Sequence, residues 1–146
     1  EDYKVAGYPV KGYVGCINTL AAYYKYNMKY CSRQGVADLR DDSWPIHTMT
    51  NDSAPASYGD NASVKNSLIA NGCSIDGTVE NCVIGRNVTV KKGAILKNCV
   101  ILPNAYIAED VKLDKVVVDK VAIINHVKKL EGTDQAPIYV KRRDRI

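Results

Sequence analysis

Two patterns of apolar positions open the chain. Residues 1–10 alternate apolar and polar side chains, as a strand does. Over residues 17–31, apolar side chains recur at intervals of three and four, so they line one helical face: Ile17, Leu20, Ala21, Tyr24, Met28 and Cys31. The patterns therefore predict a strand and then an amphipathic helix over 17–31, whose apolar face needs a surface to pack against.

A repeat replaces these patterns from residue 64 onward. Four five-residue stretches align at spacings of 15, 17 and 17 residues, namely 65–69, 80–84, 97–101 and 114–118. Recurrence at a fixed period is the signature of a solenoid, in which each coil packs on the one before it. The alignment predicts one interior column of aliphatic side chains, formed by Ile69, Ile84, Ile101 and Val118.

A shorter period of about six residues divides each coil into faces. One position repeats at the expected corners, and most of its residues tolerate a left-handed backbone: Gly72, Thr78, Asn87, Gly93, Asn104 and Asp110. Faces of six, six and five residues predict a left-handed parallel β-helix of hexapeptide repeats, with about three to four coils. An antiparallel sandwich would require strict alternation and hairpin turns, and it does not require recurrence every 17 positions.

The segment between the helix and the repeats is rich in Gly, Pro, Asp and Asn, which is the composition of a linker. We therefore divide the chain in two. Residues 1–45 are predicted to be the end of a preceding domain (strand plus helix), and residues 46–146 a β-helix domain with a C-terminal cap. Because the chain opens on strand-like sequence without an initiator Met, we expect it to be a piece of a larger protein.

Composition narrows the function classes. The formal net charge is only +4 and 46% of the 146 residues are hydrophobic, which indicates a globular protein and no nucleic-acid partner. No apolar stretch is long enough to cross a membrane, and no signal peptide is recognisable. The five cysteines form no C-x-x-C pair, so we expect reduced thiols, a cytoplasmic location and neither a zinc site nor disulfides.

Several segments resemble bacterial glucose-1-phosphate adenylyltransferases. Residues 12–17 (GYVGCI) and 23–28 (YYKYNM) resemble the end of that family's catalytic domain, and residues 44–48 (WPIHT) and 54–58 (APASY) its entry into the β-helix. Residues 64–81 are similar to the first coil of the D-type glycogen-biosynthesis subunit. The resemblance implies a structural and regulatory C-terminal region of a Mg²⁺-dependent enzyme that makes ADP-glucose and pyrophosphate from ATP and glucose 1-phosphate. It also implies oligomers and allosteric control.

The departures from this family bear on catalysis. Its Gly-rich nucleotide-binding loop has no counterpart here, and Tyr13 stands where the family has a metal-binding Asp. A neutral phenol is a poor ligand for Mg²⁺, which prefers carboxylate and water oxygens. We therefore expect no catalytic residue, metal or cofactor in this fragment, with Mg²⁺ needed by the complete enzyme. We expect the full subunit to be weakly active or modulatory and to join a catalytic subunit in a homo- or hetero-oligomer.

Other side chains are candidates for specific chemistry. A basic cluster near the C-terminus is predicted to bind an anionic effector, the alternative being a solvated tail: Lys141, Arg142, Arg143 and Arg145. His126 is the candidate base of the alternative function, a free-standing hexapeptide-repeat acyltransferase, but it lacks an orienting partner in the sequence and is interpreted as a surface histidine. Cys82 and Cys99 occupy equivalent positions and are interpreted as packing residues. The tyrosines at 23, 24, 26 and 30 are expected to pack against a missing domain.

Overall fold

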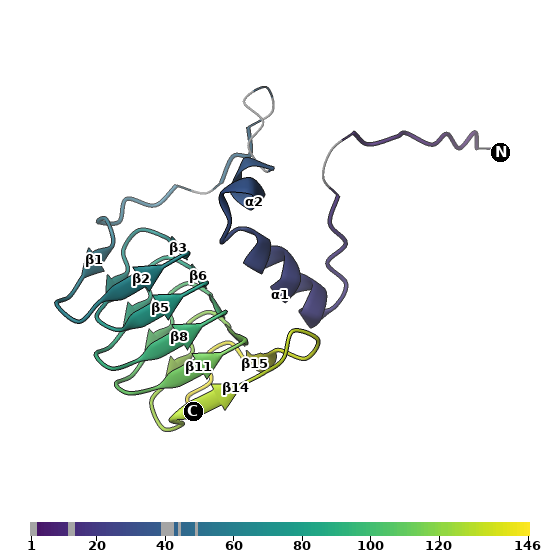
Figure 1. Cartoon of the computed structure of the whole chain (residues 1–146). Coiled ribbons are helices and arrows are strands. Elements are labelled where there is room, and N and C mark those ends of the chain that lie inside the picture. The colour runs from purple at the N-terminus through teal and green to yellow at the C-terminus, as the bar shows by residue number, and fades with distance from the viewer. Residues whose placement is uncertain (1–2, 12–13, 39–42, 44, 49) are drawn as a thin grey trace.

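The computed structural model describes residues 3–11, 14–38, 43, 45–48 and 50–146. Within this part, residues from Ser57 onward form a solenoid whose coils stack along one axis (Figure 1). Three parallel sheets of five strands each make its faces. The predicted parallel β-helix is therefore confirmed.

Each coil contributes one short strand to every sheet. The first sheet contains β1 (Ser57–Tyr58), β4 (Ser74–Ile75), β7 (Thr89–Val90), β10 (Tyr106–Ile107) and β13 (Ile123–Ile124). The second contains β2 (Ser63–Lys65), β5 (Thr78–Glu80), β8 (Ile95–Lys97), β11 (Lys112–Asp114) and β14 (Lys129–Glu131). The third contains β3 (Leu68–Ile69), β6 (Val83–Ile84), β9 (Val100–Ile101), β12 (Val116–Val118) and β15 (Ile138–Val140).

The register of the third sheet follows the sequence repeat. Ile69 pairs with Ile84, Ile84 with Ile101, and Ile101 with Val118. Ile84, Ile101 and Val118 are at most 1% exposed, and Val140 continues the column by pairing with Val118. The predicted interior column is confirmed. It stacks aliphatic side chains at the strand separation of about 4.8 Å, which leaves no room for water between coils.

Residues with left-handed backbone angles turn the chain at the corners. Five of the six predicted corner residues have positive φ, between 56° and 78°: Gly72, Asn87, Gly93, Asn104 and Asp110. Thr78 instead begins β5, because the shorter first coil turns one residue earlier, at Gly77. A side chain on Gly77 would come within 2.5 Å of the Ala94 carbonyl oxygen, so the backbones approach closely there.

The helical segment is shorter than predicted. α1 spans Leu20–Lys29 and α2 spans Arg33–Ala37. Thr19 is extended and its hydroxyl accepts a hydrogen bond from the Ala22 N–H, so it caps α1 and excludes Ile17 from the helix. The expected strand is also wrong where the structure describes it, since residues 3–11 form none. An isolated strand leaves its backbone hydrogen-bonding groups without a neighbouring strand.

α1 packs on the outer face of the third sheet. Val100 and Val117 point away from the interior column, yet they are at most 1% exposed because Tyr24, Tyr23 and Met28 cover them. Tyr24 is itself only 4% exposed. The expectation that these tyrosines pack against a missing domain is therefore wrong for Tyr24, whose partner is the solenoid. Docking of α1 also creates a hollow between the helix and the solenoid.

Candidate functional site

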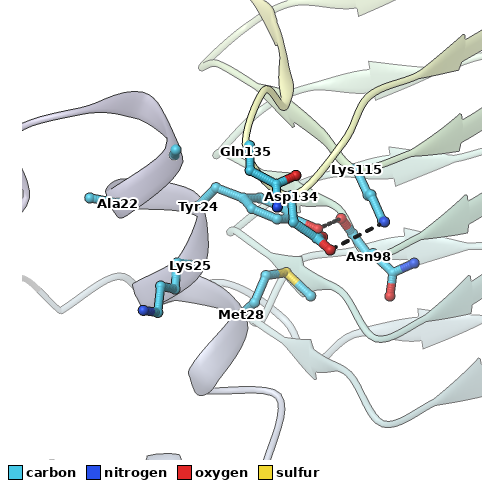
Figure 2. A pocket seen from close by; sticks show the side chains of 9 residues that line it. Ala22, Tyr24, Lys25, Met28, Asn98, Lys115, Asp134 and Gln135 are labelled. Atoms are coloured by element: carbon cyan, nitrogen blue, oxygen red, sulfur yellow. Dashed lines mark hydrogen bonds and ion pairs between the residues drawn. The ribbon is translucent and has the colours of Figure 1, made fainter.

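A hollow in the described surface lies between α1 and the solenoid. It has a volume of about 880 Å³, within the range of ligand pockets. Figure 2 shows Tyr24 and Met28 reaching from α1 toward the solenoid, while Lys25 points away from it. The lining residues are Ala21, Ala22, Tyr24, Lys25, Met28, Asn98, Lys115, Asp134 and Gln135. The hollow therefore has an apolar helical wall and a polar wall made by the solenoid.

A buried phenol joins the two walls. Tyr24 Oη donates a hydrogen bond of 2.8 Å to the backbone carbonyl of Asn98. Burial raises the pKa of the Tyr24 phenol, so it stays protonated and remains a donor at neutral pH. Without this bond the Asn98 carbonyl would lack a donor in an apolar contact, which costs free energy. The bond therefore favours one position of α1 along the solenoid.

The polar wall is built from corner residues. Asn98 Nδ2 donates to Asp114 Oδ1 at 2.9 Å, and Asn81 Nδ2 donates to Asn98 Oδ1 at 3.3 Å. Lys115 Nζ lies 3.4 Å from Asp134 Oδ2, on the loop between β14 and β15. Asn66, Asn81 and Asn98 occupy equivalent corners of successive coils and lie beside α1. Lys115 occupies the next corner, also with positive φ (55°).

The predicted effector cluster lies at the C-terminal end of the solenoid. Its members are all exposed: Lys141, Arg142, Arg143 and Arg145. The chain there continues the stacking, since Ile123 bridges Arg145 and the Arg143 N–H donates to the Lys120 carbonyl at 3.2 Å. The backbone of the cluster is therefore part of the final coil, and exposed guanidinium groups carried on it suit phosphate oxygens.

A tyrosine–aspartate pair lies next to this cluster. Tyr139 Oη donates to Asp119 Oδ2 at 2.5 Å. This hydrogen bond is the main cause that lowers the pKa of Asp119, and Lys120 and Arg142 add to it by their charges. The carboxylate consequently stays ionised and offsets part of the positive charge. Neither partner was predicted from the sequence, because the pair joins residues 20 positions apart on adjacent coils.

The other sequence candidates are not brought together. Tyr13 lies outside the described residues. His126 is exposed, and its backbone N–H donates to the Ile146 carbonyl at 2.9 Å. No hydrogen bond to its imidazole is found in the described part of the chain, and His47 is exposed on a different segment. An acyltransferase base needs an orienting partner, so the geometry does not favour that alternative.

The cysteines behave as packing residues. Cys82 and Cys99 are fully buried on successive coils, and the Cys99 N–H donates to Cys82 Sγ at 3.3 Å. The side-chain interaction with the Cys99 thiol and burial together raise the pKa of Cys82, although the N–H bond from Cys99 by itself lowers it. All five thiols are free. The interpretation of Cys82 and Cys99 as core residues is confirmed by their burial.

The described residues hold neither a metal-binding cluster nor a membrane-spanning helix. Among the described residues, no three His, Cys, Asp or Glu side chains gather where a metal ion could be held. No helix of the described residues has the length and apolar character needed to cross a membrane.

Comparison with known proteins places the solenoid in a family. Residues 52–136 match the family described as "GlmU-like, C-terminal hexapeptide". The chain belongs to this hexapeptide family. The matched range covers all the strands from β1 to β14. The family match therefore accounts for the solenoid up to β14 and includes neither α1 nor β15.

Three longer proteins match a larger share of this chain than the family model does. It is 36% identical over 138 residues to the glycogen biosynthesis protein GlgD of Bacillus subtilis, which covers 94% of this chain and 40% of that protein. It is 33% identical over 121 residues to glucose-1-phosphate adenylyltransferase of Fervidobacterium nodosum (83% and 29%), and 30% over 118 residues to that of Bacillus cytotoxicus (81% and 31%). This chain thus spans well under half the length of these relatives.

Proposed function

We propose that the chain is the structural and regulatory C-terminal region of a glucose-1-phosphate adenylyltransferase subunit that acts in glycogen biosynthesis in the cytoplasm. One observation carries this. The similarity to GlgD extends over 94% of the chain, so it necessarily includes α1 as well as the solenoid. A free-standing hexapeptide protein has no reason to share the helix that packs on Val100 and Val117.

The proposed role is non-catalytic for this region. The described residues supply a docked helix, a stacked core and two polar surfaces, and none of these presents a nucleophile or a base beside an orienting partner. The complete enzyme would use Mg²⁺ to neutralise the charge that develops in nucleotidyl transfer. The region would then position subunits, with a catalytic subunit of the same enzyme as its partner.

Copurification tests the proposal. The natural full-length protein carrying this chain is tagged and coexpressed with an untagged glucose-1-phosphate adenylyltransferase from the same genome. We expect a stable complex whose ADP-glucose synthesis differs from that of the catalytic protein alone in rate or in effector response. A tagged protein that retains no partner and leaves the synthesis unchanged contradicts the proposal. The natural reading frame is a second check, since we expect about 230 further residues upstream, the size of a catalytic domain.

We further propose that the basic cluster binds a phosphorylated effector. The support is its ordered position on the last coil, with Lys120 beside it and Asp119 held by Tyr139. Calorimetry compares the full-length protein with a variant in which Lys141, Arg142, Arg143 and Arg145 are replaced by Gln. Fructose 1,6-bisphosphate and inorganic phosphate serve as probes. We expect binding to weaken at least about tenfold, whereas equal affinity in both proteins removes the idea.

A further inference from the structure

The hollow beside Tyr24 is one section of a longer groove. A second hollow of about 660 Å³ adjoins it and shares Met28 and Asn98 as lining residues. A third, of about 260 Å³, shares Cys31, Ser32 and Arg33 with the second and reaches Leu68. We call this continuous surface the seam groove. It follows α1 and the start of α2 on one side and the coils of the solenoid on the other.

One corner column forms the solenoid wall of the seam groove. Its members are successive rungs with positive φ between 46° and 55°: Asn66, Asn81, Asn98 and Lys115. Parallel strands lie about 4.8 Å apart, so the column presents a polar side chain at that interval. A ligand that uses the whole column must therefore be linear and repeat at a similar distance.

The hydrogen-bonding capacity of this column is only partly used. Asn81 and Asn98 each donate along the column, toward Asn98 and Asp114. The Asn66 carboxamide is exposed and makes no hydrogen bond within the described part of the chain. The column therefore offers both amide donors and amide oxygens, which is the chemistry that recognises hydroxyl groups.

An extended peptide fits this wall poorly. Adding a strand requires free backbone groups at a sheet edge. Here the corner N–H groups are already bonded to the previous coil, since Asn81 donates to Lys65, Asn98 to Glu80 and Lys115 to Lys97. Side chains on one face of an extended peptide also recur only every ~6.8 Å. A hexopyranose ring, in contrast, spans a distance close to one rung and carries several hydroxyl groups.

The charges of the groove also disfavour a polyanion. Lys115 is paired with Asp134, and Lys29 is paired with Asp38 at 2.5 Å. Lys25 points away from the solenoid in Figure 2. A phosphate polymer is bound by many unpaired cations along its path, whereas two of the four cations that line the seam groove, Lys29 and Lys115, are neutralised by ion pairs. The apolar wall at Met28 and Tyr30 suits the less polar faces of sugar rings.

From this geometry we infer that the seam groove binds a neutral, linear oligosaccharide whose hydroxyl groups bond to the corner column. The site is separate from the basic cluster, and it does not depend on the proposed enzyme partner. Sugar rings lie along the column, one ring near each rung. Asn66 supplies an open carboxamide group, and Asn81 supplies the hydrogen-bonding capacity that its bond to Asn98 leaves unused. Arg33 and the Lys115–Asp134 pair supply the remaining donors and acceptors.

Isothermal titration of the natural full-length protein that carries this chain tests this inference. The probes are maltoheptaose and cellohexaose, which differ in linkage and therefore distinguish α-linked from β-linked chains. The test variant combines Asn66→Gly and Asn81→Gly, because glycine keeps positive φ while removing the carboxamide. The matched control combines Asn87→Gly and Asn104→Gly, which lie on another corner column with φ of 56° and 62°.

We expect one of the two oligosaccharides to bind, and the test variant to weaken binding about tenfold or more, through the loss of two sets of hydrogen bonds. The control variant should bind within about twofold of the unchanged chain. Absence of binding of both probes at millimolar concentration overturns the inference, as does equal weakening in both variants. Should the test variant fail to fold, side-chain amide NMR signals decide, since Asn66 and Asn81 must shift on titration and Asn87 and Asn104 must not.

Discussion

Backbone conformation selects the residues at the corners of the solenoid. An L-residue in the left-handed region brings its Cβ close to the following carbonyl oxygen, and asparagine tolerates this better than most residues. Asparagine accordingly recurs in two columns, at 66, 81 and 98 and at 87 and 104. Val121 follows Asn87 and Asn104 in the second column, with φ of 63°. A β-branched residue is poorly suited to this conformation, so Val121 holds local strain.

Replacing Val121 by Asn should therefore stabilise the protein. Val121 is 42% exposed, so little apolar burial is lost. Asn87 Nδ2 already donates to Asn104 Oδ1 at 3.2 Å, and a third asparagine extends that ladder. We expect a gain of about 1 kcal/mol in the free energy of unfolding, measured by urea titration. Val117→Asn is the control, because the fully covered Val117 should lose stability. Unchanged or reduced stability of Val121→Asn contradicts the argument.

The thiol of Cys31 provides a second test at the scale of one residue. Burial raises the pKa of Cys31 to about 11, from the ordinary value of 9.0. The folded protein therefore holds this proton more tightly than the unfolded chain. The resulting stability is present below pH 9 and is lost as the pH rises from 9 to 11.

Alkylation with iodoacetamide measures this directly, because the thiolate is the reacting form. At pH 8 we expect Cys31 to react much more slowly than the exposed Cys16, and to gain rate steeply toward pH 11. Cys73, Cys82 and Cys99 are buried and should react only on unfolding. Mass spectrometry of peptides assigns each site. Equal rates for Cys31 and Cys16 at pH 8 would show that Cys31 is not shielded.

Among the elements, the interior column of the third sheet contributes directly to stability. Ile101 is fully buried between Ile84 and Val118. Ile101→Asp places an unpaired carboxylate in a dry interior, so we expect a loss of more than about 4 kcal/mol or failure to fold. Ile101→Val removes one methylene group and should cost only about 0.5–1.5 kcal/mol. Thermal unfolding compares the two, and an unchanged melting temperature for Ile101→Asp would count against the packing.

The repeat made the solenoid predictable from the sequence, whereas the sequence pattern did not predict where α1 docks. Identical positions in successive coils must carry the same side-chain direction, so Ile84 and Ile101 could be aligned by counting residues. Val100 and Val117 recur equally well, but nothing in the period says that a helix covers their outward face. The N-terminal limit of α1 depends on Thr19, whose capping hydroxyl is a signal that periodicity alone overlooks. The Lys115–Asp134 pair joins two loops by tertiary contact.

The docking of α1 can be tested through Tyr24. Tyr24→Phe removes the hydrogen bond to the Asn98 carbonyl and should cost about 1 kcal/mol, because that acceptor loses its donor in a buried contact. Tyr24→Ala also removes the ring from Val100 and Val117, and we expect about 3–5 kcal/mol. Hydrogen exchange of α1 is the direct readout. Fast exchange in α1 with unchanged protection of β9 and β12 indicates local undocking, and slow exchange in Tyr24→Ala contradicts this role of the ring.

At the scale of the whole molecule, the outer faces of the solenoid differ in chemistry. On the third sheet α1 covers the apolar side chains Val100 and Val117. The second sheet instead carries the ion pairs of Glu80 with Lys65 at 3.7 Å and with Lys97 at 3.9 Å. Such exposed pairs add little stability, but they keep that face polar. The basic cluster is confined to the last coil. A subunit with distinct surfaces of this kind can contact a partner and an effector at the same time, which suits the proposed regulatory role.

The last prediction concerns the activity of the complete subunit. The resemblance to the adenylyltransferases implies that Tyr13 stands where that family has a metal-binding Asp, so that a neutral phenol would replace an anionic oxygen ligand. Loss of one carboxylate from such a site costs about 3 kcal/mol of transition-state stabilisation, which is roughly a hundredfold in rate. We therefore expect the full-length subunit alone to synthesise ADP-glucose at about 1% or less of the rate of a catalytic subunit.

Steady-state measurement of ADP-glucose formation, with saturating ATP, glucose 1-phosphate and Mg²⁺, decides this. The matched control is the catalytic subunit with its own aligned Asp replaced by Tyr, which should fall by the same factor. Turnover by the unpartnered subunit comparable to that of an ordinary catalytic subunit would show that Tyr13 does not mark a lost site. The reverse change, Tyr13→Asp, is informative when it raises the rate, because a gain identifies Tyr13 as the missing ligand position. An unchanged rate does not decide the question, because further catalytic residues are expected outside this chain. A modulatory subunit should have low activity in the absence of its partner, and it should change the rate of the catalytic subunit when the two form a complex.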